Sequence, residues 1–475
     1  MRLGDLAGID SELDVSGAAI DSRKVTSGCL FGAFPGSMHN GEDFIASAIE
    51  RGAVAVVARP EARVTGAVHL ADPEPRRLFA RLAAKLLSPY PETIVAVTGT
   101  NGKTSSVEMV RQLWRMAGKR SASIGTLGVT TADDQVSTGL TTPDIVTFLS
   151  NLAGLKRMGI SHVAYEASSH GLDQYRSEGQ RVAAAAFTNL SRDHLDYHAD
   201  MDAYFAAKMR LFDEVVASDG AAVVWTGDPR SGEVIARAKT RGLKLITVGP
   251  GAETIELVSQ TPTALGQMLV LRHEGKEHKL SLPLIGAYQA ANVLVAAGLV
   301  LATGGEWAET FRGMSRLAPV RGRLERAVIT KGGVPVYVDY AHTPDAIEAA
   351  IAALRPHVVG HGQGRLIIMF GAGGDRDTGK RGPMGEVAAR LADVAIVTDD
   401  NPRSEDPAAI RAAVMAGGFG LREIGGRREA IAAAIAEARA GDIVLLAGKG
   451  HEQGQILADR TTPFDDAAVA RECAI

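Results

Sequence analysis

A glycine-rich segment with a lysine and a threonine, residues 98–104 (Thr-Gly-Thr-Asn-Gly-Lys-Thr), directly follows an apolar, β-branched run at residues 93–97. A pattern of helical spacing begins right after it. This order of strand, loop and helix is the setting in which backbone N–H groups and a helix N-terminus bind phosphate. In that setting Lys103 would reach the β- and γ-phosphates of ATP, and the hydroxyl of Thr104 would bind Mg²⁺.

The loop departs from the regular Walker A pattern, because Val97 stands where that pattern has its first glycine, six residues before the lysine. A tight turn with a solvated lysine is the alternative interpretation. The position between a buried strand and a helix favours ATP binding. The residues predicted to bind ATP are Gly99, Thr100, Asn101, Gly102, Lys103, Thr104 and Ser105.

Polar side chains also follow two further apolar runs, at residues 163–165 and 184–188. Glu166 ends the first run, and an Asn, two Asp and two His, among them His194, follow the second by residue 198. Because ligands bind at the carboxyl ends of parallel strands, we expect these side chains to face the phosphate loop. A carboxylate there is an expected Mg²⁺ ligand, although a lone Glu is more often a cap or a solvated residue. The density of polar groups favours a metal–phosphate site.

Two other segments carry polar groups in helical surroundings. Lys208 lies among apolar residues at 204–212, where a lysine usually extends to water. Residues 139–144 combine hydroxyls, a proline and Asp144 ahead of an amphipathic helical pattern. They are typical of a helix N-cap, and a helix N-terminus can also bind an anion.

Alternating strands and helices must position these residues. From about residue 88 onward apolar runs and helical patterns alternate, which predicts right-handed crossovers and largely parallel, covered sheets. A chain of 475 residues is also too long for one core. We predict an α/β protein of three domains: a small α/β domain at 1–87, a central P-loop-type domain with helices on both faces of a mostly parallel sheet at 88–319, and a Rossmann-like α/β domain at 320–475.

Composition argues against several classes of function. A formal net charge of −4 gives no electrostatic case for binding nucleic acid or an anionic membrane. The sequence has no apolar run near the length of a membrane span, and its N-terminus lacks the apolar core of a signal peptide. Cys29 and Cys473 are the two cysteines, which fits a reducing compartment. We predict a cytoplasmic monomer with small-molecule partners, without nucleic acid and without membrane insertion.

The motifs resemble, in order and spacing, those of the Mur ligase family, and within it the UDP-N-acetylmuramoyl-tripeptide synthetases. The matching segments are residues 98–104, 141–144, 166–176, 187–198 and 204–212, and the resemblance extends over essentially the whole chain. It implies an ATP-dependent amide ligase of peptidoglycan precursor synthesis. ATP would phosphorylate the D-glutamyl carboxylate of a UDP-muramoyl-dipeptide, and the amine of an amino acid would attack the acyl phosphate.

The resemblance also implies roles for individual residues. The catalytic residues would be Lys103, Glu166, His194 and Lys208. Lys208 would be carbamylated by CO₂, and Mg²⁺ would be bound by Thr104, Glu166, His194 and the carbamate of Lys208. Asn292 would lie on the adenine side of ATP, although Tyr288 and Gln289 depart from the family's usual Phe-Asn. The residues matching those that hold the UDP-muramoyl-dipeptide are Ile20, Ser22, Ser37, Met38, His39, Thr141, Thr142, Ser168, Gln174 and Arg176.

The amino acid to be added is indicated by residues 400–403, which are spelled as in the branch of the family that adds meso-diaminopimelate. This amino acid carries an additional carboxylate beside its second amine, and a guanidinium can bind a carboxylate bidentately. The pocket implied by the resemblance consists of Arg376, Asp400, Asn401, Pro402, Arg403, Gly448 and Glu452.

Several alternatives stay open. A turn with a solvated arginine is the other interpretation of residues 400–403 taken alone. Among enzymes, the alternatives are a lysine-adding Mur ligase and a ligase similar to folylpolyglutamate synthetase. From another class, the chain could be a nucleotide-gated binding protein that turns nothing over.

Overall fold

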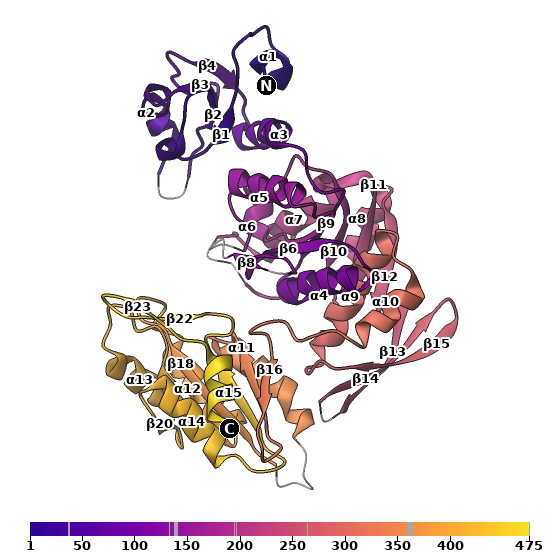
Figure 1. Cartoon of the computed structure of the whole chain (residues 1–475), viewed down its shortest axis with the longest axis vertical. Helices are drawn as coiled ribbons and strands as arrows, with labels where there is room; N and C mark the ends of the chain where they lie inside the picture. Colours follow the sequence, from indigo (N-terminus) through magenta and orange to yellow (C-terminus); the bar gives the residue numbers. More distant parts are fainter. Residues whose placement is uncertain are drawn as a thin grey trace. The chain divides into compact units, whose positions relative to one another are not determined.

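The computed structural model describes residues 1–36, 39–132, 134–136, 141–193, 195, 197–263, 265–358 and 364–474. The chain divides into two compact units, one formed by residues 1–256 and 292–313 and the other by residues 257–291 and 314–475. In the residues described, the strands form sheets of four, eleven and six strands and a two-stranded ribbon. Figure 1 shows how these elements follow one another along the chain. In the part of the chain that is described, no helix is long and apolar enough to cross a membrane.

The N-terminal sheet is parallel throughout, in the order β1-β2-β3-β4. Its strands are β1 (Gly17–Ala19), β2 (Cys29–Gly32), β3 (Ala53–Ala58) and β4 (Val68–Ala71). The helical elements around it are α1 (Leu3–Ala7), η1 (Ser22–Lys24), η2 (Gly41–Phe44), α2 (Ile45–Glu50) and α3 (Pro75–Leu87). α3 begins at a proline, which suits a first helical turn because its missing N–H would have no partner there. Its buried residues Phe79, Ala80 and Ala83 recur at helical spacing.

The central sheet has the order β15-β14-β13-β12-β11-β10-β5-β9-β6-β7-β8. The strand pairs from β13 to β6 are parallel, whereas β6-β7-β8 and β14-β15 pair antiparallel. The strands are β5 (Thr93–Thr98), β6 (Ser121–Gly125), β7 (Gly128–Thr130), β8 (Gln135–Val136), β9 (His162–Glu166), β10 (Val182–Phe187), β11 (Val216–Trp225), β12 (Lys244–Gly249), β13 (Ile255–Thr263), β14 (Gly266–His273) and β15 (Lys276–Leu282). Because β10, β5 and β9 are neighbours, the segments after these strands meet at one edge of the sheet.

Helices cover both faces of this sheet. Val224 of β11 shares a core with Val234 of α8, while the neighbouring Val223 faces Gly298 of α9. The alternation of β11 therefore places helices on opposite sides. The helical elements are α4 (Lys103–Met116), α5 (Ile145–Arg157), α6 (Ser169–Asp173), α7 (Met201–Arg210), η3 (Leu211–Val215), α8 (Ser231–Thr240), α9 (Tyr288–Ala302) and α10 (Trp307–Met314).

The C-terminal sheet has the order β16-β17-β21-β18-β19-β20, with β16 antiparallel to β17 and the other pairs parallel. The strands are β16 (Glu325–Ile329), β17 (Pro335–Asp339), β18 (Leu366–Ala372), β19 (Val394–Asp399), β20 (Arg422–Glu423) and β21 (Ile443–Ala447), and the ribbon is β22 (Gly454–Ile456) with β23 (Thr461–Pro463). The helical elements are α11 (Pro344–Leu354), η4 (Arg355–His357), α12 (Arg381–Leu391), α13 (Pro407–Met415), α14 (Arg427–Glu437) and α15 (Asp466–Cys473).

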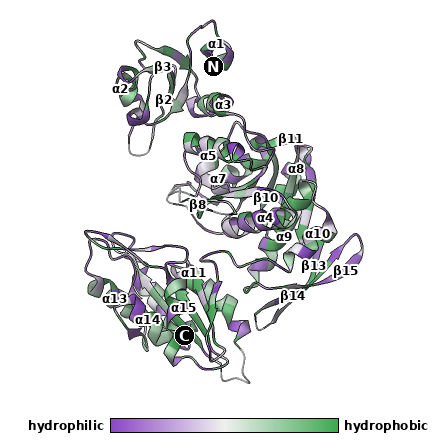
Figure 2. Ribbon diagram, in the orientation of Figure 1, coloured by the Kyte–Doolittle hydropathy of each residue, from purple (hydrophilic) through white to green (hydrophobic). Residues whose placement is uncertain are grey.

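Alternation along β18 divides the core of this domain into two layers. Ile368 packs in one cluster with Ile351 of α11, and Ile367 packs in the other with Ile431 of α14. Both faces of the sheet are thus covered, as in a doubly wound fold. In Figure 2 the strands of this sheet are mostly in green, the colour of hydrophobic residues.

The predicted α/β fold, with a small N-terminal sheet, a central P-loop-type sheet and a Rossmann-like C-terminal sheet, is confirmed. The central sheet is more mixed than predicted, because antiparallel strands extend it at both ends. The predicted domain limits after residues 87 and 319 stay a prediction.

Candidate active site

The phosphate loop joins the end of β5 to α4, which begins at Lys103. Gly99 has φ of 143° and Gly102 has φ of 85°, conformations that side chains rarely adopt. A Cβ at Gly99 would also collide with the hydroxyl of Thr188, and one at Gly102 would collide with the side-chain oxygen of Asn292. The two glycines therefore allow a tight turn and leave the loop close to its neighbours.

The segment after β10 holds the loop in shape. The backbone N–H of Thr100 donates to the carbonyl of Asn189 at 2.9 Å. The N–H of Asn101 donates to Asn189 Oδ1 at 2.9 Å, and Thr188 Oγ1 donates to the carbonyl of Asn101 at 2.7 Å. These bonds fix the backbone of the loop from the neighbouring strand.

The lysine of the loop bends back over it. Lys103 Nζ donates to the carbonyls of Gly99 at 2.9 Å and Thr100 at 2.7 Å. The ammonium group thus lies on the loop itself, where it would exchange carbonyl oxygens for phosphate oxygens when a nucleotide binds.

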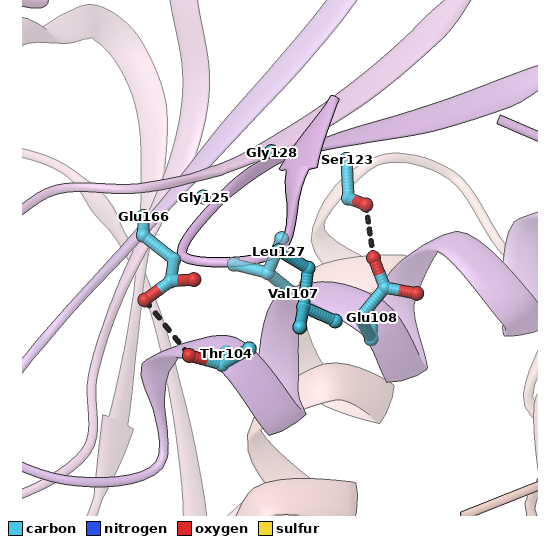
Figure 3. A pocket seen from close by; sticks show the side chains of 8 residues that line it. All are labelled: Thr104, Val107, Glu108, Ser123, Gly125, Leu127, Gly128 and Glu166. Carbon is cyan, nitrogen blue, oxygen red and sulfur yellow. Dashed lines mark hydrogen bonds between the residues drawn. The ribbon is translucent and has the colours of Figure 1, made fainter. Parts of the chain in front are cut away.

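Beside the loop, a hydroxyl from α4 and a carboxylate from β9 point toward one another (Figure 3). Thr104 Oγ1 donates to Glu166 Oε2 at 3.0 Å. Glu166 is buried, and its Oε1 accepts from the backbone N–H of Thr126 at 2.7 Å. A hydroxyl and a carboxylate are hard oxygen ligands of the kind that Mg²⁺ prefers.

The same pocket continues past these two residues. It is lined by Thr104, Val107, Glu108, Ser123, Gly125, Leu127, Gly128 and Glu166. At its other end the hydroxyl of Ser123 donates to Glu108 (Figure 3). The carboxylate of Glu108 also pairs with Arg111 at 2.8 Å. Glu108 is therefore held by a cation and a hydroxyl.

Lys208 of α7 is 1% exposed, contrary to the usual behaviour of a helical lysine. Its Nζ donates to the carbonyl of Gly99 at 2.8 Å and lies 4.2 Å from the centre of the Tyr204 ring. Burial, and to a lesser degree the charge of Lys103, hold the pKa of Lys208 well below its usual value. The amine therefore contacts the phosphate loop, and its lowered pKa favours the neutral form.

The structure brings together three of the four predicted metal ligands around the phosphate loop: Thr104, Glu166 and Lys208. The fourth, His194, lies outside the described residues. Within the described ranges there is no group of three or more His, Cys, Asp or Glu that could hold a metal. The predicted set includes instead a hydroxyl and a modified lysine, which are not residues of those four types.

Five residues predicted to hold the muramoyl-peptide form one network next to Glu166. Thr142 Oγ1 donates to the carbonyl of Glu166 at 2.8 Å and accepts from Ser168 Oγ at 3.0 Å. Arg176 donates to the carbonyl of Thr142 at 3.2 Å and to Gln174 Oε1 at 2.7 Å. A further contact of 3.1 Å joins the hydroxyls of Thr141 and Thr126.

The predicted uridine-nucleotide residues lie in the N-terminal domain. Ser22 begins η1, which is capped by the side chain of Asp21, and Ile20 is partly buried just before it. The ring of His39 lies 6.4 Å from that of Phe44. Ser37 and Met38 lie outside the described residues.

The predicted amino-acid pocket occupies the carboxyl edge of β18, β19 and β21, which are neighbours in the order β21-β18-β19. Asn401 Nδ2 donates to Glu452 Oε2 at 2.7 Å. Arg403 Nη1 donates to the carbonyl of Gly374 at 2.8 Å. The remaining members also converge: a Cβ added at Gly448 would meet Asp400, and one added at Gly373 would meet both Arg376 and Arg403. Pro402 lies between Asn401 and Arg403 and is buried.

Sequence reasoning missed several residues that shape these sites. Thr126, which binds Glu166, follows β6 without any motif around it. Lys449 is fully buried and donates to Asn401 Oδ1 at 2.9 Å and to the carbonyl of Gly454 at 2.7 Å. Its position between two glycines, directly after the buried strand β21, is the sequence feature that could have indicated a site residue.

The fold and the phosphate loop define a multidomain α/β protein with a nucleotide-binding centre. Family models match the chain in sequence: "Mur ligase family, catalytic domain" at residues 14–85, "Mur ligase middle domain" at 97–300 and "Mur ligase, glutamate ligase domain" at 322–450.

Close relatives cover nearly the whole chain. The UDP-N-acetylmuramoyl-L-alanyl-D-glutamate--2,6-diaminopimelate ligase of Zymomonas mobilis is 58% identical, over 98% of this chain and 96% of that protein. The protein of the same name from Caulobacter vibrioides is 48% identical, over 98% of this chain and 97% of its own length. A solved structure of a ligase with this name has 31% identity and a TM-score of 0.76, covering 100% of this chain and 98% of its own. The chain belongs to the Mur ligase family.

Proposed function

We propose that the protein is the ATP-dependent ligase that adds meso-2,6-diaminopimelate to UDP-N-acetylmuramoyl-L-alanyl-D-glutamate in peptidoglycan precursor synthesis. The observation that carries this proposal is the 58% identity, over 98% of the chain, to a relative whose name states this reaction. ATP would phosphorylate the free D-glutamyl carboxylate, the amine of diaminopimelate would attack the acyl phosphate, and phosphate would leave.

The phosphate loop would carry the first step. Lys103 would leave the carbonyls of Gly99 and Thr100 to bind the β- and γ-phosphates, and its charge would stabilise the phosphoryl group during transfer. The remaining residues of the predicted ATP site would hold the nucleotide from the backbone of the loop, with Asn292 beside it. The contact of Gly102 with Asn292 supports placing this asparagine at the nucleotide.

We further propose that Thr104, Glu166, His194 and carbamylated Lys208 hold Mg²⁺. The hydroxyl and carboxylate oxygens 3.0 Å apart beside the phosphate loop support this assignment. When bound, the ion would neutralise phosphate charge as a Lewis acid. Lys208 would contribute as a carbamate, because only a neutral amine adds CO₂ and burial disfavours the ammonium form.

The substrates would be divided between separate parts of the chain. Ile20, Ser22 and the loop with Ser37, Met38 and His39 would bind the uridine nucleotide. Thr141, Thr142, Ser168, Gln174 and Arg176 would hold the muramoyl-peptide with its carboxylate near the phosphate loop, and their shared network beside Glu166 supports this.

Arg376, Asp400, Asn401, Pro402, Arg403, Gly448 and Glu452 would bind diaminopimelate. The distal end of this substrate carries both a carboxylate and an ammonium group. Cationic Arg376 and Arg403, together with acidic Asp400 and Glu452, offer a partner to each charge. Lysine lacks the distal carboxylate, so an arginine in this pocket would lose its partner.

The limits of the domains, 1–87, 88–319 and 320–475, and the monomeric state belong to the same proposal. A cytoplasmic location is supported by the co-substrate, because ATP is available in the cytoplasm.

A phosphate-release assay tests the proposed function. The purified protein would be supplied with ATP, Mg²⁺, UDP-N-acetylmuramoyl-L-alanyl-D-glutamate and single amino acids from a panel. We expect sustained phosphate release with meso-diaminopimelate and little with lysine. Faster turnover with lysine would indicate the lysine-adding alternative. Nucleotide binding without turnover under every combination would indicate a nucleotide-gated binding protein.

A further inference from the structure

Two arginines of the first compact unit, Arg76 and Arg176, lie partly buried with no carboxylate of the described residues within 4.0 Å. Arg76, at the start of α3, donates to the carbonyl of Pro35 at 2.8 Å, and its guanidinium carbon lies 5.1 Å from the centre of the Phe34 ring. Arg176 donates to the carbonyl of Thr142 and to the amide oxygen of Gln174. All four partners are electrically neutral.

The next residue in the chain shows the contrast. Arg77 has a carboxylate of Glu214 at 2.9 Å and one of Glu74 at 3.7 Å. In the part of the chain that the structure describes, neither Arg76 nor Arg176 has an acidic oxygen within 4.0 Å. Among the described residues, the unit thus pairs Arg77 directly with carboxylates, whereas the charges of Asp173 and Asp144 act on Arg76 and Arg176 only from beyond 4.0 Å.

Contacts between the neighbouring residues bring the two arginines to the same junction. The hydroxyl of Tyr175 donates to Glu74 at 3.0 Å, and the guanidinium carbon of Arg77 lies 5.9 Å from the centre of the Tyr175 ring. Glu74, two residues before Arg76, and Arg77, directly after it, therefore contact Tyr175, the residue that precedes Arg176. Burial, and next the charge of Arg176, lower the pKa of Arg76, so the two cations repel one another.

Two like charges held together in a partly buried place are unfavourable unless an anion lies between them. The proposed substrate has such an anion in a suitable position. Its diphosphate joins the uridine, expected in the N-terminal domain beside the loop of Pro35 and His39, to the muramoyl-peptide, expected beside Arg176. Arg76 lies between the two places: it is hydrogen-bonded to Pro35, beside the expected uridine site, and it is next to the segment of Arg176, beside the expected muramoyl-peptide site.

We propose that Arg76 is a further substrate-binding residue, which acts together with Arg176 on the diphosphate of the uridine nucleotide. This inference rests on the proposed function for the identity of the nucleotide. A guanidinium suits the task because it binds phosphate oxygens bidentately and stays charged when partly buried. Arg76 would bind the substrate without taking part in the chemical step.

Titration calorimetry with three probes tests this role: uridine, UDP and UDP-N-acetylmuramoyl-L-alanyl-D-glutamate. The proteins are the wild type, Arg76→Gln, Arg76→Lys and a control, Arg81→Gln, whose arginine is exposed on the same helix. For Arg76→Gln we expect the Kd of UDP and of the full nucleotide to rise about 10- to 100-fold, the worth of a lost charge-assisted hydrogen bond. Uridine affinity and kcat at saturating substrate should not change. Arg76→Lys should recover part of the loss, and Arg81→Gln should match the wild type.

Each of three results would overturn the proposal. An equal loss for uridine and UDP would mean that Arg76 acts by shaping the loop at Pro35. A loss confined to the dipeptide-bearing nucleotide would assign Arg76 to a carboxylate of the peptide. Unchanged UDP affinity in Arg76→Gln would remove the role altogether. The proposed function fails separately, if wild-type protein binds none of the uridine compounds and releases no phosphate with the complete set of substrates.

Discussion

Lys208 shows how burial changes what a residue can do. Taken by sequence alone, a lysine on a helix extends to water, but this side chain is 1% exposed and its amine reaches the carbonyl of Gly99. Such an amine is useful as a carbamate, which would replace a cation with an acidic group next to Thr104 and Glu166.

The first prediction concerns this residue. Lys208→Ala should remove most turnover, because the carbamate ligand is lost, while leaving the far-UV circular dichroism spectrum of the wild type. Short carboxylates such as acetate or propionate added to the variant should restore part of the rate. The measurement is phosphate release with and without the added acid. If active wild-type enzyme labelled with carbon-13 bicarbonate contains an unmodified Lys208, the proposed carbamate is contradicted.

Arg403 is the residue that we propose to select diaminopimelate over lysine. Its backbone has φ of 52°, and its N–H donates to the carbonyl of Ile456 at 3.1 Å. These constraints direct the side chain toward Gly374 and beside Gly373, near Arg376.

Arg403→Ala should lower kcat/KM for meso-diaminopimelate about 30- to several-thousand-fold, since losing a charge-assisted, partly buried pair costs roughly 2–5 kcal/mol. The preference for diaminopimelate over lysine should also narrow. The measurement is the ratio of kcat/KM values for the two amino acids in wild type and variant. A variant that keeps the full wild-type ratio would show that Arg403 is not the selector.

A candidate site residue could be predicted from the sequence where its type and position indicate its role, but not where its role depends on tertiary contacts. Type and position in the sequence indicate Lys103 and Thr104 of the phosphate loop, and Glu166 at the end of a buried apolar run. Thr126 and Lys449 do not, because a backbone N–H to Glu166 and a buried ammonium on Asn401 arise from tertiary packing. The roles of the predicted site residues stay predictions.

At the scale of elements, long apolar runs were read correctly. The apolar runs at residues 93–97 and 163–165 lie within β5 and β9, and the run at 184–188 overlaps β10. The hairpin β14-β15 was not predicted, although its signal was present. Leu269 and Leu271 are buried in alternation along β14, and the turn at Glu274 and Gly275 has φ of 48° and 74°. The predicted alternation of strands and helices does not include such a hairpin.

We expect the segment after β21 to make a pH-dependent contribution to stability through His451. Burial, followed by the charges of Arg323 and Arg321, lowers the pKa of His451 to about 4 from its usual 6.5. Between these two values the unfolded chain binds a proton that the folded chain does not. Stability should therefore fall as the pH drops from 6.5 toward 4, by less than about 1.4 kcal/mol per pH unit for this partly exposed group.

His451→Gln should reduce this loss. The measurement is the shift of the urea midpoint between pH 6.5 and pH 5 in both proteins, at constant ionic strength. Over this interval the urea midpoint of the wild type should fall further than that of the variant. Equal shifts in the two proteins would show that His451 is not the titrating group.

At the scale of the whole molecule, the proposed sites separate binding from chemistry. The phosphate loop, Glu166 and Lys208 belong to the central sheet and its helices, whereas Ile20 and Ser22, which are assigned to uridine, lie beside the N-terminal sheet. Ser22 begins η1, where the nearby side chain of Asp21 is occupied by Arg23. Ser22 thus offers a hydroxyl for binding, while the neighbouring carboxylate of Asp21 is already paired with Arg23.

Ser22→Ala should therefore raise KM for the uridine nucleotide and leave kcat nearly unchanged, as expected when binding is lost equally from substrate and transition state. Initial rates over a range of nucleotide concentrations, with ATP and diaminopimelate saturating, measure both constants. A large fall of kcat at saturating nucleotide would contradict the division of roles.

The central claim is that this ligase adds diaminopimelate to the uridine-linked dipeptide. A competition experiment tests it most directly: wild-type enzyme with ATP, Mg²⁺, UDP-N-acetylmuramoyl-L-alanyl-D-glutamate and equal concentrations of meso-diaminopimelate and L-lysine, with the nucleotide products identified by mass spectrometry. The account predicts that the diaminopimelate-containing tripeptide nucleotide dominates and that its formation matches ADP release. A product dominated by the lysine tripeptide, or ADP release without either product, would contradict it.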